Sequence, residues 1–283
     1  FESATIFYTS AAFDSNSNKV VIAYRDAGNS DYGTAIVGTV SGTSISFGSA
    51  AVFETANSIY FSATFDSSNN KVVIAYQDYG NSQYGTAVVG TVSGTSISFG
   101  TPVVFNSTRC SFNSATFDSN LNKVVIAFQD SNNSDRGAAV VGTVSGTSIS
   151  FGSPVVFESD GVSYTFATFD SNLNKVVIAY QNNDNSNYGT FVVGTVSGTS
   201  ISFGSATVFE SADSRYISAT FDSSNNKVVI AYRDNGNSNY GTAVVLQLAS
   251  TNLTSENFIG FSDGAFADGQ SAVINTTNTI DRN

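Results

Sequence analysis

Residues 71–100 read KVVIAYQDYGNSQYGTAVVGTVSGTSISFG, and this stretch recurs along the chain with a period of 52 residues. Its second half, VGTVSGTSISFG, is repeated without a change at four places. A period in this range is typical of proteins that are built from repeated supersecondary units. The successive copies begin at Lys19, Lys71, Lys123, Lys175 and Lys227.

Each copy contains four extended runs, which in the second copy are residues 59–65, 71–76, 85–92 and 96–105. The runs are rich in Val, Ile, Thr, Phe and Tyr, and none shows apolar residues at helical spacing, so strands are favoured. The breaks between them are rich in Asn, Asp, Ser and Gly, which favour turns. Each copy therefore predicts a four-stranded antiparallel meander.

The second and third runs are apolar at consecutive positions, which indicates a sheet that is covered on both faces. Pro102 and Pro154 fall in the fourth run, and proline is tolerated at a sheet edge. The sequence therefore predicts an all-β, five-bladed β-propeller in which the first run lines a central channel. The five repeats are expected at 1–52, 53–104, 105–156, 157–208 and 209–250.

The last part of the chain departs from the repeat. Residues 251–283 are rich in Gly, Asp and Asn, and we expect them to close the fifth repeat or to lead into a further module. Phe1 aligns with Phe53, so the first residue falls inside a repeat, as expected for a piece of a longer protein.

Composition limits the possible partners. The 283 residues are 41% hydrophobic, enough for one sizeable core, and the net charge is −11 with a pI near 4.2. An acidic chain lacks the basic face that nucleic acids and anionic membranes require. No apolar run approaches the ~18 residues of a membrane-spanning helix. We therefore expect neither a nucleic-acid partner nor a membrane partner.

The absence of histidine excludes Ser-His-Asp and Cys-His catalysis and the commonest zinc ligand sets. A glycosidase would need carboxylates in unlike environments, whereas most acids here are copied from repeat to repeat. The motif DSNSNK resembles a calcium loop but lacks a downstream glutamate, and such clusters are ordinary hairpin turns. We expect no enzyme, cofactor or metal, with a glycosidase as the alternative.

Two segments vary between the repeats, those aligned with residues 5–9 and with residues 27–32, whereas the DSxxNK and SGTS turns hardly change. Because successive turns of a meander alternate between its two ends, both variable segments are expected on one face of the propeller. Either exposed loops have drifted, or this face contacts a partner.

The variable face contains the candidate ligand-binding residues. Tyrosines could stack on sugar rings, and aspartates could accept hydrogen bonds from sugar hydroxyls or instead cap their own turns. The candidates are Tyr32, Tyr84, Tyr188, Tyr240, Asp26, Asp78, Asp130, Asp234, Arg109 and Arg215. A further aromatic series in the first run has two interpretations, core packing or a wall of the central mouth; it comprises Tyr8, Tyr60, Phe112, Tyr164 and Tyr216.

The pattern FDSNxNKVVIAYxDxxNSxYGTAVVGTVSGTSISFG resembles repeat arrays of marine bacteriophage structural and tail-fibre-like proteins, and NFIGFSDGAFADGQSAVI resembles a module that follows such arrays. The resemblance implies a virion or extracellular location, contact with a cell-surface receptor, and other segments of a larger fibre as partners. The architecture is similar to five-bladed lectin propellers at the level of fold. Near-identical copies also fit a designed or consensus propeller without a native ligand.

These observations favour a non-enzymatic module that binds a glycan or receptor through repeated sites, which would act by avidity. The alternative is a structural spacer or protein-docking disc.

Overall fold

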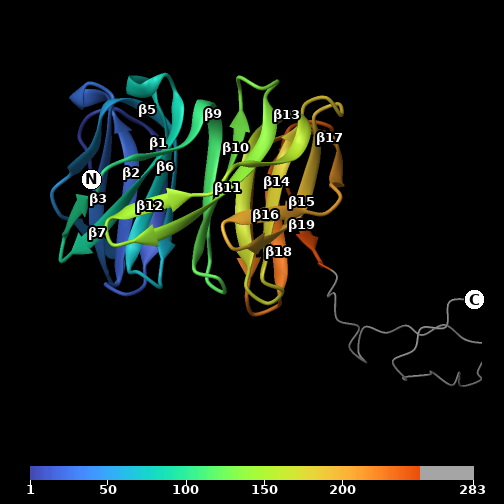
Figure 1. Ribbon diagram of the computed structural model, residues 1–283. Helices are drawn as coiled ribbons and strands as arrows, with labels where there is room; N and C mark the ends of the chain where they lie inside the picture. The colour runs from blue at the N-terminus through green and yellow to red at the C-terminus, as the bar shows by residue number, and fades with distance from the viewer. Residues whose placement is uncertain (249–283) are drawn as a thin grey trace, which may run out of the picture. The chain divides into compact units, whose positions relative to one another are not determined.

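The computed structural model describes residues 1–248, and Phe1–Gln247 form one compact unit, which is described here by itself (Figure 1). This unit contains 19 strands in one antiparallel sheet and two short 3-10 helices. The prediction of an all-β, antiparallel fold is confirmed. The predicted terminal segment 251–283 lies outside the described residues. Among residues 1–248, no helix has the length and apolarity that crossing a membrane requires.

The strands recur in four kinds. The first strands are β1 (Ile6–Asp14), β5 (Ala51–Asp66), β9 (Val103–Asp118), β13 (Val155–Asp170) and β17 (Thr207–Asp222). The second strands are β2 (Lys19–Asp26), β6 (Lys71–Asp78), β10 (Lys123–Asp130), β14 (Lys175–Asn182) and β18 (Lys227–Asp234). The third strands are β3 (Tyr32–Ser41), β7 (Tyr84–Ser93), β11 (Arg136–Ser145), β15 (Tyr188–Ser197) and β19 (Tyr240–Leu246).

Short strands follow the third strands in four places, at β4 (Ser44–Phe47), β8 (Ser96–Phe99), β12 (Ser148–Phe151) and β16 (Ser200–Phe203). The 3-10 helices, η1 (Ala27–Asn29) and η2 (Tyr79–Asn81), connect second to third strands. We call a first, second and third strand, with the short strand that follows them where there is one, a repeat unit. The units are numbered 1 to 5 in chain order.

The predicted fourth run, residues 96–105, is not one strand. It divides into β8 and the beginning of β9, and Pro102 lies between the two. β9 pairs with β7 of unit 2 through its first half and with β10 of unit 3 through its second half. One 16-residue strand therefore passes from the outer edge of one unit to the inner edge of the next.

Packing between successive units explains the consecutive apolar residues of the second and third strands. Val73 and Ala75 of unit 2 share a core with Ile126 and Phe128 of unit 3, and all four are fully buried. In the second strands of units 2 to 4, all residues except the opening lysine are buried. The prediction that these strands are covered on both faces is therefore confirmed for the inner units.

The turns with constant sequence adopt backbone conformations that few residue types tolerate. The Asp66 carboxylate accepts hydrogen bonds from the backbone amides of Ser68 and Asn69, at 2.9 and 3.0 Å. Asn70 and Gly94 adopt φ values of 53° and 62°, a left-handed region that asparagine and glycine tolerate best. These turns therefore keep their sequence for structural reasons, and the aspartate that suggested a calcium loop already bonds to its own turn.

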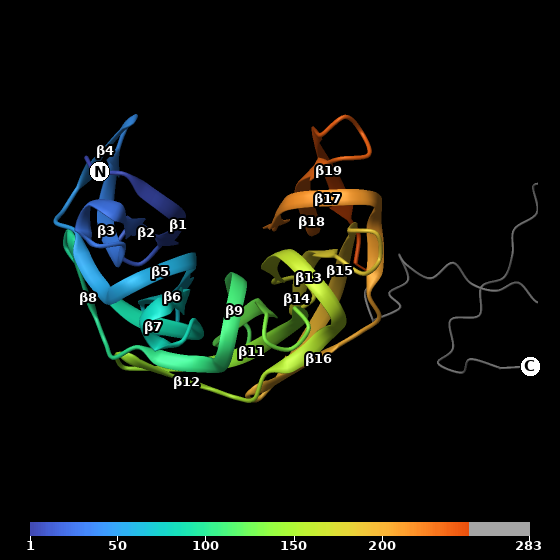
Figure 2. The same ribbon diagram turned by 90° about the horizontal axis from the view of Figure 1, so that it is seen from above.

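The units form an arc that is open between unit 1 and unit 5 (Figure 2). Strand pairing joins each unit to the next through β3–β5, β7–β9, β11–β13 and β15–β17. Among the described strands, no pairing joins β19 to β1. The ring that the five-bladed prediction implied is thus not closed by residues 1–248.

Buried tyrosines bond to glutamates at the start of the first strands. The Tyr76 hydroxyl donates to Glu54 at 3.1 Å, and Tyr180 and Tyr232 donate in the same way to Glu158 and Glu210. In unit 3, Phe128 replaces the tyrosine donor and Asn106 replaces the glutamate acceptor, so the two positions change together. The hydrogen bond therefore couples the two positions.

We expect Tyr76→Phe and Glu54→Asn each to lower the free energy of unfolding by about 1–2 kcal/mol, because each breaks a hydrogen bond to a buried group. The double variant reproduces the pair of unit 3, and it should lose less than the sum of the single losses. Urea unfolding of the four proteins measures this coupling. Tyr79→Phe, at an exposed tyrosine, is the control, and additive losses would contradict the coupling.

Stability should fall at alkaline pH. Burial raises the pKa of Tyr24 to about 12, and burial is also the main cause that raises the pKa of Tyr76, Tyr180 and Tyr232. A phenol with a higher pKa in the folded state contributes stability that is complete below its unfolded pKa of about 10 and is lost as the pH rises through its folded pKa. The melting temperature, followed by circular dichroism, should therefore drop above pH 10. A flat profile up to pH 12 would contradict this.

Candidate functional site

The first strand of every unit is bulged at its aromatic residue. In unit 1 the pairing of β1 with β2 shifts register between Phe7 and Ser10, and the other units shift at the corresponding place. A bulge re-aims the side chain that it displaces, and a non-glycine residue at positive φ is strained. The five aromatic residues have φ values of 51° to 56°: Tyr8, Tyr60, Phe112, Tyr164 and Tyr216.

The bulges place the five rings side by side in a row, which we call the aromatic arc. Successive ring centroids from Tyr8 through Tyr60, Phe112 and Tyr164 to Tyr216 are 5.4, 5.1, 5.2 and 5.1 Å apart. The two end rings, Tyr8 and Tyr216, are 42% and 65% exposed. The interpretation of this series as core packing is therefore wrong for the end rings.

Four of these rings border a cavity of about 230 Å³ whose lining comes from all five units. Its other lining residues directly follow the aromatic positions, and they include Thr9, Asn113, Thr165 and Ile217. The aromatic series therefore forms a wall of the central mouth, the second of its two interpretations. The volume lies below the ~300–1,000 Å³ of drug-sized ligand sites, and it suits a small molecule or the terminal group of a larger one.

Two buried polar atoms at the cavity have no hydrogen-bond partner. They are Oδ1 of Asn113 and Oγ1 of Thr165, in side chains that are only 7% and 5% exposed. Asn113 Nδ2 donates to the backbone oxygen of Tyr60 at 3.3 Å, and its amide oxygen is covered and has no partner. Buried polar groups are rarely left unpaired, since each costs about 1–3 kcal/mol. Residues that line the cavity therefore carry unused hydrogen-bonding capacity, in two oxygens that neighbouring atoms cover.

An ion pair lies at each end of the arc, Arg25 with Asp31 beside Tyr8 and Arg215 with Asp213 beside Tyr216. Burial is the main cause that raises the pKa of Tyr60, so its hydroxyl stays protonated at neutral pH and can donate. Arg215 forms an ion pair with Asp213, with Nη2 and Oδ2 2.8 Å apart. The hydrogen bond between them lowers the pKa of Asp213 and raises that of Arg215. The predicted Arg215 thus lies beside the arc as a paired charge.

The two variable segments lie together on one side of each unit, as predicted. In units 1, 3, 4 and 5 a backbone amide of the loop between second and third strands donates to the variable segment that precedes the arc aromatic, for example Ala27 to Thr5 at 3.1 Å and Ser131 to Arg109 at 2.9 Å. In unit 2 the loop glycine Gly80 lies against Ala56. Links also cross between units, as from Ser214 to Asn187 at 3.0 Å. We call these joined segments the loop zone. The aromatic arc follows directly after them in the chain.

The predicted aspartates of the loop zone cap their own turns. Asp26 accepts from the amide of Gly28 at 3.0 Å, and Asp78 accepts from that of Gly80 at 2.8 Å. Asp234 bonds to the amide of its own loop in the same way, and all three side chains are buried. The turn-capping alternative is therefore observed, and their binding of sugar hydroxyls stays a prediction.

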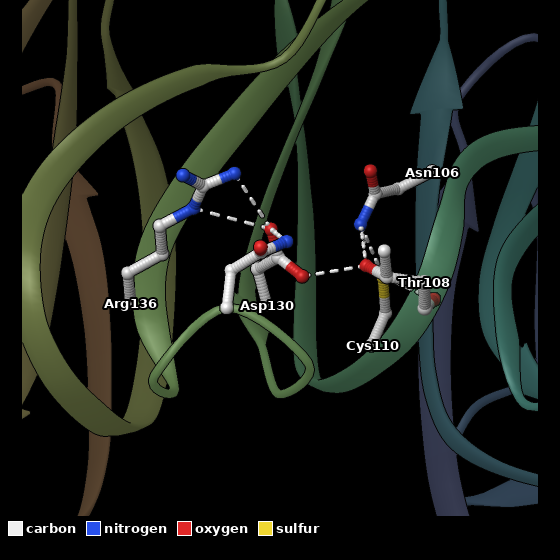
Figure 3. Close-up of polar contacts among 6 residues, drawn as sticks. Asn106, Thr108, Cys110, Asp130 and Arg136 are labelled. Atoms are coloured by element: carbon white, nitrogen blue, oxygen red, sulfur yellow. Dashed lines mark hydrogen bonds and ion pairs between the residues drawn. The ribbon is translucent and has the colours of Figure 1, made fainter.

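Asp130 belongs to a cluster that only unit 3 forms (Figure 3). Nη2 and Nε of Arg136 lie 3.0 and 3.2 Å from its carboxylate, and Thr108 donates to it at 2.5 Å. Asn106 bonds to Thr108 and to Cys110. Burial raises the pKa of the Cys110 thiol to about 12, so the cysteine stays protonated and unreactive. The cluster is thus self-contained, and Asp130 has little capacity left for a ligand.

The predicted tyrosines open the third strands in the loop zone and do not line the cavity. Tyr84 is paired in register with Arg109, and Tyr188 is paired with Asp213. Tyr32 and Tyr84 are half-buried, whereas Tyr240 is largely exposed. The structure therefore brings Tyr84 and Arg109 together but leaves the four tyrosines separate from one another. Their role in binding stays a prediction.

Sequence reasoning did not find Asn113 and Thr165. A signal was available, because the position after each arc aromatic differs in nearly every unit: Thr9, Phe61, Asn113, Thr165 and Ile217. Variation at a position beside a fixed aromatic residue is typical of a site whose scaffold is constant and whose specificity is not.

Comparisons with known proteins support the fold. No protein-family model matches the chain, and no curated protein matches it. The structure is similar to SapL1 lectin in complex with alpha methyl fucoside, with 14% identity and a TM-score of 0.52 over 84% of this chain and 76% of that one. It is also similar to AofleA from Arthrobotrys oligospora, with 10% identity and a TM-score of 0.54 over 85% of this chain and 68% of that one.

A third similar structure is Trypanosoma rangeli sialidase, with 14% identity and a TM-score of 0.50 over 85% of this chain and 44% of that one. At these identities the likeness shows the fold alone, a lectin-like β-propeller arrangement of antiparallel strands.

We expect Thr165→Val to leave the free energy of unfolding unchanged or to raise it by up to about 1–2 kcal/mol, because the hydroxyl that it removes is buried without a partner. Thr190→Val is the matched control. Thr190 is equally buried, but its hydroxyl bonds to the backbone oxygen of Tyr188 at 3.4 Å, so this change should destabilise. Urea unfolding measures both, and a larger loss for Thr165→Val would show that its hydroxyl is satisfied.

Proposed function

We propose that the chain is a non-enzymatic carbohydrate-binding module whose central cavity takes one sugar ring. The observation that carries this proposal is the aromatic arc, with the unpaired Asn113 and Thr165 oxygens beside it. All five rings are held at bulged positions with strained backbone conformations. The stability of the surrounding fold must offset this strain, and such strained residues are typical of ligand sites.

A sugar ring matches the chemistry of the cavity. Its C–H faces pack on aromatic rings, and its hydroxyls both donate and accept hydrogen bonds. After a side-chain movement that uncovers both oxygens, Asn113 Oδ1 would accept a hydrogen bond from one sugar hydroxyl, and Thr165 Oγ1 would donate to or accept from a second. The Tyr60 hydroxyl would donate to a third. Phe112 keeps the stacking surface without a hydroxyl. The lectin fold of the similar structures, one of them holding a methyl fucoside, agrees with this ligand class.

The loop zone would contact the remainder of a glycan. Tyr84 and Arg109 form one such patch, and Tyr240 presents an exposed ring in unit 5. Repeated weak contacts of this kind would add by avidity. Tyr32, Tyr188 and the capping aspartates stay candidates for the same surface, and Arg215 would meet the ligand only as part of its ion pair with Asp213.

The biological setting stays a prediction. The resemblance to phage fibre repeats suggests receptor binding on a cell surface by a virion or extracellular protein that contains these five 52-residue units. The spacer or docking-disc role is the alternative if no glycan binds. A hydrolytic role is less well supported, because glycosidases need a pair of free carboxylates, and Asp213 beside the arc is held by Arg215.

A glycan array followed by calorimetry with the best monosaccharide tests the proposal. We expect Phe112→Ala and Asn113→Ala each to weaken binding about 10-fold or more, since each removes a stacking face or a hydrogen bond worth ~1–3 kcal/mol. Leu121→Ala, at an exposed side chain in the turn between β9 and β10, outside both the cavity and the loop zone, is the control.

Three outcomes would count against it. Binding that survives the arc variants but is lost in Tyr84→Ala would move the site to the loop zone. Absence of binding to any glycan would favour the spacer, and turnover of an oligosaccharide would establish an enzyme.

A further inference from the structure

Unit 5 has an apolar face that no described residue covers. Val245 is 60% exposed, whereas the equivalent valines of units 1, 2 and 3, Val37, Val89 and Val141, are at most 1% exposed. Ala231 is exposed as well, although its counterparts in units 1 to 4 are fully buried. In each inner unit this surface packs on the following unit. We call it the trailing face.

Unit 1 has the opposite surface uncovered, which we call the leading face. Ile45 is 43% exposed, whereas Ile97, Ile149 and Ile201 in the next three units are 3–6% exposed. Val40 is exposed too. Val20 and Ile22 are only half-buried, although the same positions in units 2 to 5 are fully buried. A cavity of about 270 Å³ lies on this face, between Phe1, Ile6 and Ile22.

The two faces are the two halves of an interface that the fold forms four times. Between units 2 and 3, Val73, Ala75 and Val89 of a trailing face pack with Val124 and Ile126 of a leading face. The same positions on the uncovered faces are Val229, Ala231, Val245, Val20 and Ile22, so the residue types match. The opening of the arc is therefore bordered by complementary surfaces.

Polar contacts across the interfaces also have unused counterparts at the opening. The Ser10 hydroxyl accepts from the Ala63 amide of the next unit at 2.9 Å, and Ser62 and Ser114 repeat the contact at the same distance. Ser218 occupies this position in unit 5, and Ala11 carries the equivalent amide in unit 1. Neither has such a neighbour among the described residues.

The aromatic arc ends at the same opening. Tyr216 and Tyr8 are its most exposed rings, and no ring contact joins them within residues 1–248. Arginines partly cover the ends, with Arg233 5.1 Å from the Tyr216 ring centroid and Arg25 5.4 Å from that of Tyr8. The inner units carry glutamine at these arginine positions, and Gln181 reaches across to Asp213 of the next unit at 2.6 Å.

We propose that the opening binds one further repeat unit of the same 52-residue type. Such a unit presents both a leading and a trailing face, so it would continue the existing interfaces in both directions. It would also supply the missing ring of the arc and complete the wall of the central cavity. A whole second copy fits less well, because it would bring five units to an opening bordered by the first and last units of one chain.

The repeat register provides a direct test. A copy of residues 53–104 placed before Phe1 creates the junction Val104–Phe1, which repeats the natural Val104–Phe105 junction. The added unit is joined to unit 1, so protection of unit 5 reports whether it fills the opening. We expect thiol labelling of Val245→Cys in the extended chain to be at least about tenfold slower than in the parent chain, because the side chain becomes buried.

Val156→Cys is the matched control, because Val52, Val104, Val156 and Val208 are all 38–44% exposed and do not lie at the interfaces. The natural Cys110 is buried and contributes little labelling. Unchanged labelling of Val245→Cys in the extended chain would overturn the proposal. A parent chain that forms a dimer, or in which Val245→Cys is already protected, would also overturn it.

A second pair of variants decides the matter if the extended chain does not fold. In the parent chain we expect Val245→Glu to shift the melting temperature by less than about 2 °C, because the face is open, whereas Val141→Glu, inside an interface, should unfold the protein. Equal loss in both variants would show that the trailing face of unit 5 is already covered in the parent chain, and it would overturn the proposal. None of these measurements depends on sugar binding.

Discussion

Packing between the apolar faces of successive units is the interaction on which the rest of the structure depends. The second strands carry valine, isoleucine, alanine and tyrosine without alternation, so each unit needs a neighbour on both sides to remove these residues from water. The long first strands add a covalent link, because one strand belongs to the outer edge of one unit and the inner edge of the next. Curvature and the central cavity both follow from this stacking.

The same stacking places the candidate site. Each bulge would present one aromatic side chain on its own, but stacking brings the five bulges together at ring separations of 5.1 to 5.4 Å. The site is therefore a product of repetition, and the residues that break the repetition supply its polarity. Asn113 differs from its counterpart in every other unit, Thr165 differs from all but Thr9, and their side-chain oxygens lack partners. A symmetric scaffold thus carries an asymmetric hydrogen-bonding surface.

Repetition also explains why the predicted aspartates gave an ambiguous signal. An acid that is copied in most units usually serves the backbone, and Asp26, Asp78 and Asp234 cap the turns in which they occur. Unit 3 shows how far such positions can change together, since Asn106, Thr108 and Arg136 form a closed cluster around Asp130. Positions that differ between the units are therefore better indicators of ligand contact than positions that repeat.

The sequence by itself determined the repeat, the antiparallel strands, the burial of both faces of the second strands and the placement of both variable segments on one side, because local composition and spacing encode them. Only the tertiary structure decided that residues 103–118 form one strand shared by two units, since strand pairing depends on neighbours distant in the chain. It also decided that the aromatic series faces a cavity, because a one-residue bulge reverses the side-chain direction that alternation predicts. The opening of the arc was also decided only by the tertiary structure, because closure depends on the curvature summed over four interfaces.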